Sequence, residues 1–502
     1  MSRSTRAIVV RVAATMAAMA LVFGTGGWPA AADPSTSTTP QPGPDFWEPP
    51  APNDGLVSGL NPHAGPDHPF VQDVGCIQSG TLNQSLDEIP PAQSMLDIKS
   101  AQQFSTGQGI TVAVIDTGVN PHPFFQQRLS GGGDFVDTKD DGTTDCDGHG
   151  TLTAGIIAAD PQDPNVGFIG VAPDAHILAI RQTSQAYHFT DPTSNDKITA
   201  GDPLTLAEAI ISAVNQHVQV ITTSVDVCEP ADIAIADMNS PGSDDQKLQA
   251  AIHYAFENNV VVVNSAGNVA TTPDSNQSQQ QASSSPCASV PQNDNSNPND
   301  VKQIEIPAVY SDNLLSVASV DPTIGTVSPF SEFGPWVNIA APGQDIVSVD
   351  PGRDGKTLAN EFAEPGQQQV GPIQGTSFAA PYVAGVVALV RAKFPNLSAA
   401  QVIQRIEATA QHPSGPSGRN NQVGFGIVDP VAALTADVPG QNGVPVAGAT
   451  QIRAQVPAAP AKDPLPMRVA LLGTVGGLIA LLVVLFVVRT RRRNAERAAA
   501  RS

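Results

Sequence analysis

The sequence predicts an α/β domain with a mainly parallel central sheet and helices on both of its faces. Apolar runs of strand length alternate with helical patterns along the middle of the chain, as expected where crossovers connect parallel strands. The strand candidates are 110–115, 177–180, 218–223, 260–264 and 314–320. The first and fourth runs are almost continuously apolar and β-branched, which is typical of strands buried on both faces.

Helical patterns fill the gaps between these runs, at 149–159, 206–217, 245–258, 377–393 and 398–410. In the last of them Val402, Ile403 and Ile406 form one apolar face, and Ser398 is expected to be the N-cap. A further helix is expected around 94–104, before the first strand. In sheets of this kind, functional side chains gather at the carboxyl ends of the strands.

The composition limits the functions that the chain can serve. Of its 502 residues 41% are hydrophobic, enough for a large core, and the formal net charge is −22. This acidic balance argues against nucleic acid or an anionic lipid surface as a partner. We expect no metal and no other cofactor. The acidic stretch at Asp137, Asp140 and Asp141 is interpreted as a solvated loop rather than a calcium site.

The N-terminus predicts an export signal over 1–32. Several arginines come first, an apolar run follows at 12–23, and small residues at 30–32 offer a cleavage site. The run is too short to cross a bilayer comfortably, and a disordered tail is the alternative. An N-terminal extension is expected over 33–106, and its first part, 33–61, is rich in Pro, Ser and Thr.

The C-terminus predicts a membrane anchor. An uncharged apolar run at 469–488 indicates a single membrane-spanning helix over 467–488, with a buried core helix as the alternative. The tail 489–502 is rich in arginine and is expected in the cytoplasm, which places the body of the protein outside the cytoplasmic membrane. A Pro- and Ala-rich linker, 436–466, connects the two parts.

Four cysteines are present: Cys76, Cys146, Cys228 and Cys287. Outside the cytoplasm an even number favours two disulfides, for which three connectivities exist. We favour Cys76–Cys146, which would tie the extension to the loop before His149, and Cys228–Cys287, which would close a long polar loop. Four buried thiols are the alternative, and the spacings match no zinc site.

Three separated segments carry the chemistry, and each lies where a predicted element begins or ends. They are 114–118 (VIDTG), 147–151 (DGHGT) and 375–381 (GTSFAAP). They supply Asp116, His149 and Ser377 in that order. A serine hydroxyl needs a neighbouring base to become a nucleophile, an imidazole can be that base, and a carboxylate fixes the imidazole tautomer. The pattern and its order therefore predict a serine peptidase.

Asn268 is the candidate donor for the oxyanion of such a reaction, together with the backbone N–H of Ser377 at the start of a helix. Each of these residues also has a local alternative. Asp116 and Asn268 could be turn formers, and His149 and Ser377 could simply begin helices. Their joint occurrence in this order favours catalysis. Pro381 is expected in the first turn of the helix, where its missing N–H does little harm.

These segments and the one around Asn268 resemble the subtilase family of serine peptidases. The resemblance implies a subtilisin-like fold over 107–435. It also implies that Asp116, His149 and Ser377 form a catalytic triad. It places Asn268 in the oxyanion hole.

The whole layout resembles the mycosins, the membrane-anchored subtilases of mycobacterial type VII secretion systems. This resemblance implies an extension that wraps the domain and stays attached. It implies a protein substrate and a membrane-embedded type VII secretion complex as partners. The first hypothesis is a narrow-specificity endopeptidase outside the membrane, and the second is a structural component of the complex with catalysis secondary. A sugar- or lipid-binding surface protein with a vestigial fold is a third alternative.

One segment departs from the subtilase pattern. Many subtilases have glycines after the strand that borders the substrate, but here Val225 and Asp226 follow Ser224. Ser224 is a candidate for substrate binding. Asp226 is interpreted as a solvated or capping residue, with selection of basic substrate side chains as the alternative. Asp145 and Asp147 are interpreted as solvated loop acids.

Overall fold

The computed structural model describes residues 48–441 and 465–499, except for 64, 270–286, 288–289, 291–292, 294–300, 364, 368–369 and 415–417. The chain divides into two units, Met1–Val444 and Pro445–Ser502. The predicted export signal 1–32, most of the long polar loop and most of the linker 436–466 lie outside the described residues.

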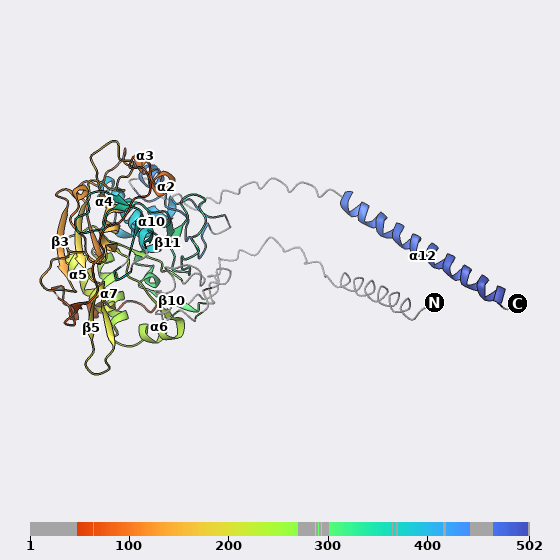
Figure 1. The fold of residues 1–502 in the computed structure, drawn as a ribbon, viewed down its shortest axis with the longest axis horizontal. Coiled ribbons are helices and arrows are strands. Elements are labelled where there is room, and N and C mark those ends of the chain that lie inside the picture. The colour runs from red at the N-terminus through yellow and green to blue at the C-terminus, as the bar shows by residue number, and fades with distance from the viewer. Residues whose placement is uncertain are drawn as a thin grey trace. The chain divides into compact units, whose positions relative to one another are not determined.

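A seven-stranded parallel sheet forms the centre of the first unit, in the spatial order β12-β11-β9-β7-β2-β4-β3. Along the chain its strands are β2 (Thr111–Asp116), β3 (Leu129–Asp134), β4 (His176–Arg181), β7 (Val220–Thr223), β9 (Val261–Ser265), β11 (Leu314–Val320) and β12 (Ile339–Pro342). Strand β3 lies at one edge, where it is labelled in Figure 1. The predicted parallel α/β sheet is confirmed.

The main helices are α4 (His149–Ala158), α5 (Pro203–Asn215), α7 (Asp244–Glu257), α9 (Thr376–Lys393) and α10 (Ala399–Ala408). Alternate residues of β2 point to opposite faces of the sheet. Val112 and Val114 join the apolar cluster that contains α4, α9 and α10. Ala113 and Ile115 join the cluster that contains α5 and α7. The continuous apolar run of this strand is therefore explained by burial on both faces.

Shorter elements surround this core. The helices are α2 (Pro91–Met95), α3 (Ile98–Ala101), α6 (Ala231–Met238) and α11 (Pro430–Thr435), with 3-10 turns η1 (Asp54–Gly59), η2 (Pro123–Phe125) and η3 (Ala308–Tyr310). The strands are β1 (Val71–Gln72), β5 (Ser184–Thr190), β6 (Lys197–Ala200), β8 (Val227–Pro230), β10 (Gln303–Ile306), β13 (Ser348–Val349), β14 (Leu358–Ala359), β15 (Glu361–Phe362) and β16 (Gly371–Pro372). The first three of these strands form one small sheet, which joins the extension to the peptidase region.

Two predictions about elements need correction. The helix expected around 94–104 is broken into α2 and α3, because Asp97 adopts a left-handed conformation with φ of 48° and interrupts the helical path. Strand β3 was not predicted, because its glycines at 131–133 give no apolar alternation.

The second unit contains the helix α12 (Leu465–Ala499), which includes the predicted span 467–488. Within the part of the chain that the structure describes, no helix is both long enough and apolar enough to cross a membrane. The membrane-spanning helix therefore stays a prediction.

Candidate active site

Asp116 and His149 meet where β2 ends and α4 begins. Asp116 is the last residue of the strand and His149 is the first of the helix. His149 Nδ1 lies 2.7 Å from Asp116 Oδ1, and the aspartate is 2% exposed. A carboxylate only accepts hydrogen bonds, so this contact requires the proton on Nδ1 and leaves Nε2 as a base.

Gly150 makes this close approach possible. A Cβ at residue 150 would lie 2.1 Å from the carbonyl oxygen of Gly118 and 3.1 Å from Asp116 Cβ. The N–H of Gly150 instead donates to Thr117 Oγ1 at 2.9 Å, which fastens the helix to the strand end. Gly150, the second glycine of the DGHGT segment, is thus required because the backbones of β2 and α4 are in contact there.

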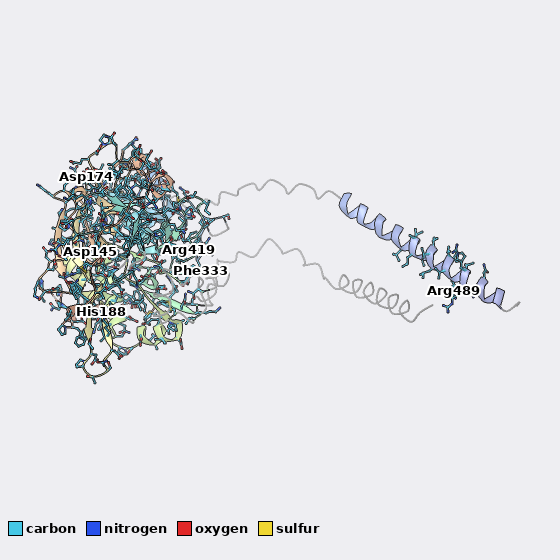
Figure 2. All side chains as sticks on the ribbon, in the orientation of Figure 1. Asp145, Asp174, His188, Phe333, Arg419 and Arg489 are labelled. Atoms are coloured by element: carbon cyan, nitrogen blue, oxygen red, sulfur yellow. A yellow bond between two sulfur atoms is a disulfide. The ribbon has the colours of Figure 1, made fainter. Side chains whose placement is uncertain are left out.

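Asp145 and Asp147 are not solvated, and that prediction is wrong. Each is 4% exposed, and Figure 2 labels Asp145 among the side chains of the first unit. Asp145 accepts hydrogen bonds from the N–H groups of Gly148 at 2.7 Å and Thr151 at 2.9 Å. Asp147 accepts from the N–H of Gln185 at 2.7 Å. Both carboxylates therefore hold the loop that presents His149: Asp145 accepts from N–H groups at the start of α4, which need acceptors, and Asp147 ties the loop to β5.

The pKa of both carboxyls is raised, mainly by burial. For Asp145 burial and the neighbouring Asp147 raise the pKa to about 7, although hydrogen bonds from Thr151 and Gly148 oppose this shift. Burial also raises the pKa of Asp147, while Ser184, Gln185 and His149 lower it.

Ser377 is the second residue of α9 and is partly exposed, between buried neighbours. The ring of the next residue, Phe378, lies 4.9 Å from the imidazole of His149. Gly375 precedes the helix, and a Cβ there would stand 3.0 Å from Ser377 Oγ. The structure thus brings the start of α9 to the imidazole and leaves space around the hydroxyl.

Pro381 is not in the first turn of α9, as predicted, but inside the helix. Because proline has no N–H, the carbonyl four residues earlier, that of Ser377, loses its helical donor. The hydroxyl of Ser224 replaces that donor, at 3.1 Å from the Ser377 oxygen. The contact shows Ser224 supporting the backbone of Ser377, and its expected contact with substrate stays a prediction.

Asn268 also lies at the start of α9. Its Oδ1 accepts from the N–H of Thr376 at 3.0 Å and from the Thr376 hydroxyl at 3.1 Å. Because both groups of Thr376 donate, the amide oxygen of Asn268 must face Thr376. The amide nitrogen, Nδ2, therefore points away from Thr376 and can donate elsewhere. Asn268 is exposed, and its backbone is held in a bridge with Ser331. The amide is therefore oriented before any substrate arrives.

Sequence reasoning missed Glu305 and Glu332, which lie close to this region and are 2% and 0% exposed. Glu305 packs against Gly267, the residue before Asn268. The only signal in the sequence was that both acids stand in or near apolar runs, and such a position does not by itself distinguish a buried acid from an exposed one.

Both disulfides of the structure join the pairs favoured above. Cys76 is bonded to Cys146 with a Cα separation of 4.4 Å, and Cys228 to Cys287 with 5.9 Å. The first bond ties the extension to the loop that Asp145 holds. The next residue, Ile77, adds a hydrogen bond from its N–H to the carbonyl of Cys146 at 3.0 Å.

Among the residues that the structure describes, no cluster of three His, Cys, Asp or Glu side chains is arranged to hold a metal ion.

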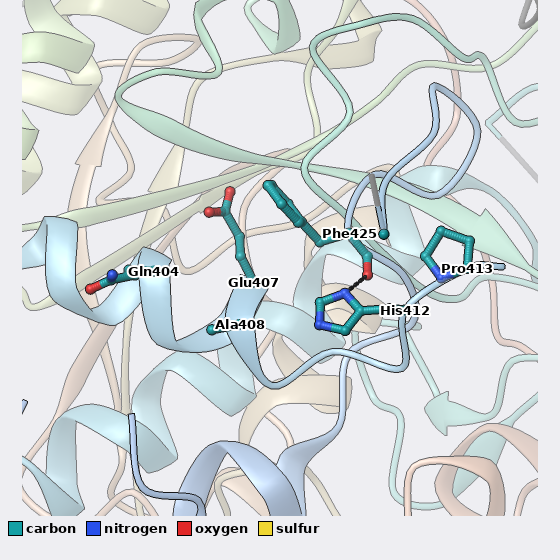
Figure 3. A pocket seen from close by; sticks show the side chains of 7 residues that line it. Gln404, Glu407, Ala408, His412, Pro413 and Phe425 are labelled. Carbon is teal, nitrogen blue, oxygen red and sulfur yellow. Dashed lines mark hydrogen bonds between the residues drawn. The ribbon is translucent and has the colours of Figure 1, made fainter. Parts of the chain in front are cut away.

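A separate hollow, lined by α10 and a later loop, contains none of the predicted site residues. Figure 3 shows Glu407, His412 and Phe425 around it. His412 Nδ1 lies 2.8 Å from the Phe425 carbonyl there.

Comparisons with known proteins identify the family of the chain. Residues 107–426 match the model of the subtilase family. Mycosin-1 of Mycolicibacterium smegmatis is 41% identical over 388 residues, which cover 75% of this chain and 79% of that protein. The solved structure of the serine protease MycP1, described as an essential component of the type VII (ESX-1) secretion system, matches with a TM-score of 0.64 at 41% identity over 77% of this chain and 99% of that chain. A chain of an intact ESX-5 inner membrane complex matches with a TM-score of 0.67 at 37% identity, over 88% of this chain and 99% of that chain.

Proposed function

Because the chain belongs to the mycosins, a group within the subtilase family of serine proteases, we propose that Asp116, His149 and Ser377 are its catalytic triad. The observation that carries the proposal is the 2.7 Å contact between His149 Nδ1 and the buried Asp116, at the point where Phe378 brings α9 to the imidazole. In this arrangement Nε2 of His149 is the only ring nitrogen able to accept a proton.

In the proposed reaction Ser377 Oγ attacks the carbonyl carbon of the substrate peptide bond while His149 Nε2 takes the hydroxyl proton. Asp116 stabilises the imidazolium that forms. The oxyanion accepts hydrogen bonds from Asn268 Nδ2 and from the N–H of Ser377. His149 then gives its proton to the leaving amine, and the acyl group on Ser377 is later transferred to water by the same base.

Turnover by the Ser377→Ala variant tests this proposal. Purified full-length protein in mild detergent is incubated with a library of peptides, and new termini are identified by mass spectrometry. Removing the nucleophile is expected to lower kcat by about 10⁶, the size of the effect in the subtilisin series. Ser194→Ala, on an exposed loop, is the matched control and should retain full turnover. Equal turnover by both variants would reject the triad.

We also propose that the chain is organised as predicted from its sequence. The parts are the signal 1–32, the extension 33–106, the peptidase domain 107–435, the linker 436–466, the membrane helix 467–488 and the tail 489–502. Contacts of the extension support its retention: besides the Cys76–Cys146 bond, the N–H of Gly80 donates to Asp350 at 2.8 Å and the N–H of Thr81 to the carbonyl of Glu361 at 2.8 Å.

The proposed location is the cytoplasmic membrane, with the peptidase domain outside and the tail in the cytoplasm. The apolar side chains of α12 between Leu478 and Val488 are exposed, so this helix needs an apolar environment that the chain itself does not supply. The arginines from Arg489 onward support a cytoplasmic tail. Resistance of the protein to alkaline extraction from membranes, lost on truncation after residue 435, is the expected result.

A structural role in a type VII secretion complex is the second proposed function. The match to a chain of the ESX-5 inner membrane complex favours it, and the partner would be a membrane-embedded complex of this type. Deleting the gene is expected to abolish secretion, whereas Ser377→Ala should spare it. Equal loss of secretion in both strains would reject a role that is separate from catalysis.

A further inference from the structure

Two acidic side chains lie close to the segments that surround the start of α9, and we call Asp226 and Glu305 the acidic pair. Asp226 stands two residues after Ser224, whose hydroxyl contacts the Ser377 carbonyl. Glu305 is on β10, which pairs antiparallel with β8. In that ribbon Cys228 faces Glu305, so the residues just before β8 are held next to the carboxylate.

Glu305 lies directly below the backbone of the proposed oxyanion hole. A Cβ on Gly267 would stand 2.4 Å from Glu305 Cδ and 2.8 Å from its Oε1. Gly267 has φ of 102°, a conformation that suits glycine, and Asn268 follows it. The absence of a side chain at residue 267 thus lets the carboxyl group of Glu305 pack against the backbone next to Asn268.

The carboxyl group of Glu305 has an unmet hydrogen-bonding capacity. Glu305 is 2% exposed, and its Oε1 has no hydrogen-bond partner in the described part of the chain. Glu332, whose charge also acts on Glu305, is different: it accepts from the N–H of Phe333 at 3.0 Å and from the amide of Gln303. A buried acceptor without a donor is costly, so such an atom points to a donor that arrives with a ligand.

The electrostatics of the pair agree with a cationic ligand. Burial raises the pKa of Asp226 to about 6, and the attraction of His149 opposes this shift. Burial, Asp226 and Glu332 together raise the pKa of Glu305 well above its usual range. A positive charge placed between the two carboxyls would favour their ionised forms and so oppose these shifts.

We propose that the acidic pair selects substrates with a basic side chain, Arg or Lys, at the residue whose carbonyl Ser377 attacks. That carbonyl must lie between Ser377 and Asn268, so the side chain of the same residue is directed between the segment that ends at Asp226 and the segment around Gly267. There an arginine or lysine would supply the donors that Glu305 lacks. The inference rests on the proposed role of Ser377 and names the substrate class.

Peptide aldehydes test this selection, because they form a reversible adduct with the nucleophile and differ only in their last side chain. Aldehydes that end in Arg, Lys, Leu or Ala compete with a fluorophosphonate probe for Ser377 of the full-length protein in mild detergent. The arginine and lysine aldehydes are expected to protect at concentrations at least about tenfold lower than the leucine aldehyde. Asp226→Asn should reduce this ratio to about twofold or less, while Asp226→Glu should keep most of it.

Glu305→Gln is the second variant, and its folding is checked by circular dichroism before the competition is measured. Asp232→Asn, which removes an exposed acid on α6, is the matched control and should leave the ratio unchanged. The preference for the arginine and lysine aldehydes over the leucine aldehyde should also rise from about pH 5 to about pH 8, because Asp226 ionises in this range. The groups that face Asp226 are His149 on α4 and Glu305 on β10, and the leucine aldehyde, measured at each pH, corrects for effects of pH on adduct formation itself.

The outcomes separate this inference from the proposed function. Equal protection by the four aldehydes in the unaltered protein, or a ratio that survives both Asp226→Asn and Glu305→Gln, would overturn the selection of basic side chains. Failure of the probe to label Ser377 at all would instead overturn the proposed nucleophile.

Discussion

The hydroxyl of Ser224 donates a 3.1 Å hydrogen bond to the main-chain carbonyl of Ser377. Pro381 leaves that carbonyl without its helical donor, so a proline inside α9 and a serine after β7 act together on the proposed nucleophile. The first turn of α9 is thereby held from outside the helix. The segment after β7 also carries Asp226, so support of the nucleophile and the proposed substrate selection come from one stretch of three residues.

Ser224→Ala should destabilise the protein by about 1 kcal/mol, because the partly buried carbonyl of Ser377 loses the hydrogen bond from the Ser224 hydroxyl. It should also lower kcat by about tenfold with little change in KM, since the nucleophile shifts and the substrate contacts remain. Denaturant unfolding and steady-state kinetics measure the two effects. Ser224→Thr keeps the hydroxyl and should restore most of both, and a rise in KM alone would point to a contact with substrate instead.

Asn268→Ala should lower kcat by about 10²–10³, because the oxyanion loses one of its two proposed donors. KM should change little, since the donor acts on the charge that develops during the reaction. The measurement is the hydrolysis of a peptide that the unaltered protein cleaves. An unchanged kcat would mean that Nδ2 of Asn268 does not face the oxyanion.

Gly150→Ala should separate Asp116 from His149. The new methyl group would stand 2.1 Å from the carbonyl oxygen of Gly118, and because this neighbour is backbone, the start of α4 must move. A loss of about 10² in kcat/KM is expected from such a displacement. Gly59→Ala is the control, because a Cβ there meets nothing within 4 Å. Full activity in the Gly150 variant would show that the contact of β2 with α4 can relax without consequence.

Glu332 should make the protein less stable as the pH rises from about 4.5 to about 7. Burial raises its pKa from 4.5 to about 7, so in this range the folded chain keeps a proton that the unfolded chain has released. The folded state then binds more protons, and the free energy of unfolding falls by up to about 3 kcal/mol across the window. Urea unfolding at several pH values measures this decline. Glu332→Gln, which cannot ionise, should make it shallower by that amount, and an unchanged slope would contradict the assignment.

The sequence was sufficient for the parts of the fold that repeat a local pattern. The β-branched run of β2 and the apolar face of α10 were recognisable because burial imposes a periodicity on them. Asp116, His149, Asn268 and Ser377 could be singled out as candidates because their neighbouring residues carry backbone requirements as well as chemistry. β3 was missed, since its glycines leave no side chains from which a period can be read.

Burial of single charged residues could not be predicted. Asp145 and Asp147 stand in a polar loop, and only the packing of that loop against α4 and β5 puts them out of solvent. Glu305 is buried by contact with Gly267, which lies far from it in the sequence. Such contacts depend on the tertiary fold, and no local pattern in the chain reports them.

The most direct measurement of the central assignment is the position of a covalent adduct. The full-length protein is treated with a fluorophosphonate at neutral pH, digested, and the modified peptide is sequenced by mass spectrometry. A single stoichiometric adduct on Ser377 is expected, and it should disappear in His149→Ala although Ser377 is still present. An adduct on another residue, or labelling of Ser377 that does not depend on His149, would contradict the assignment.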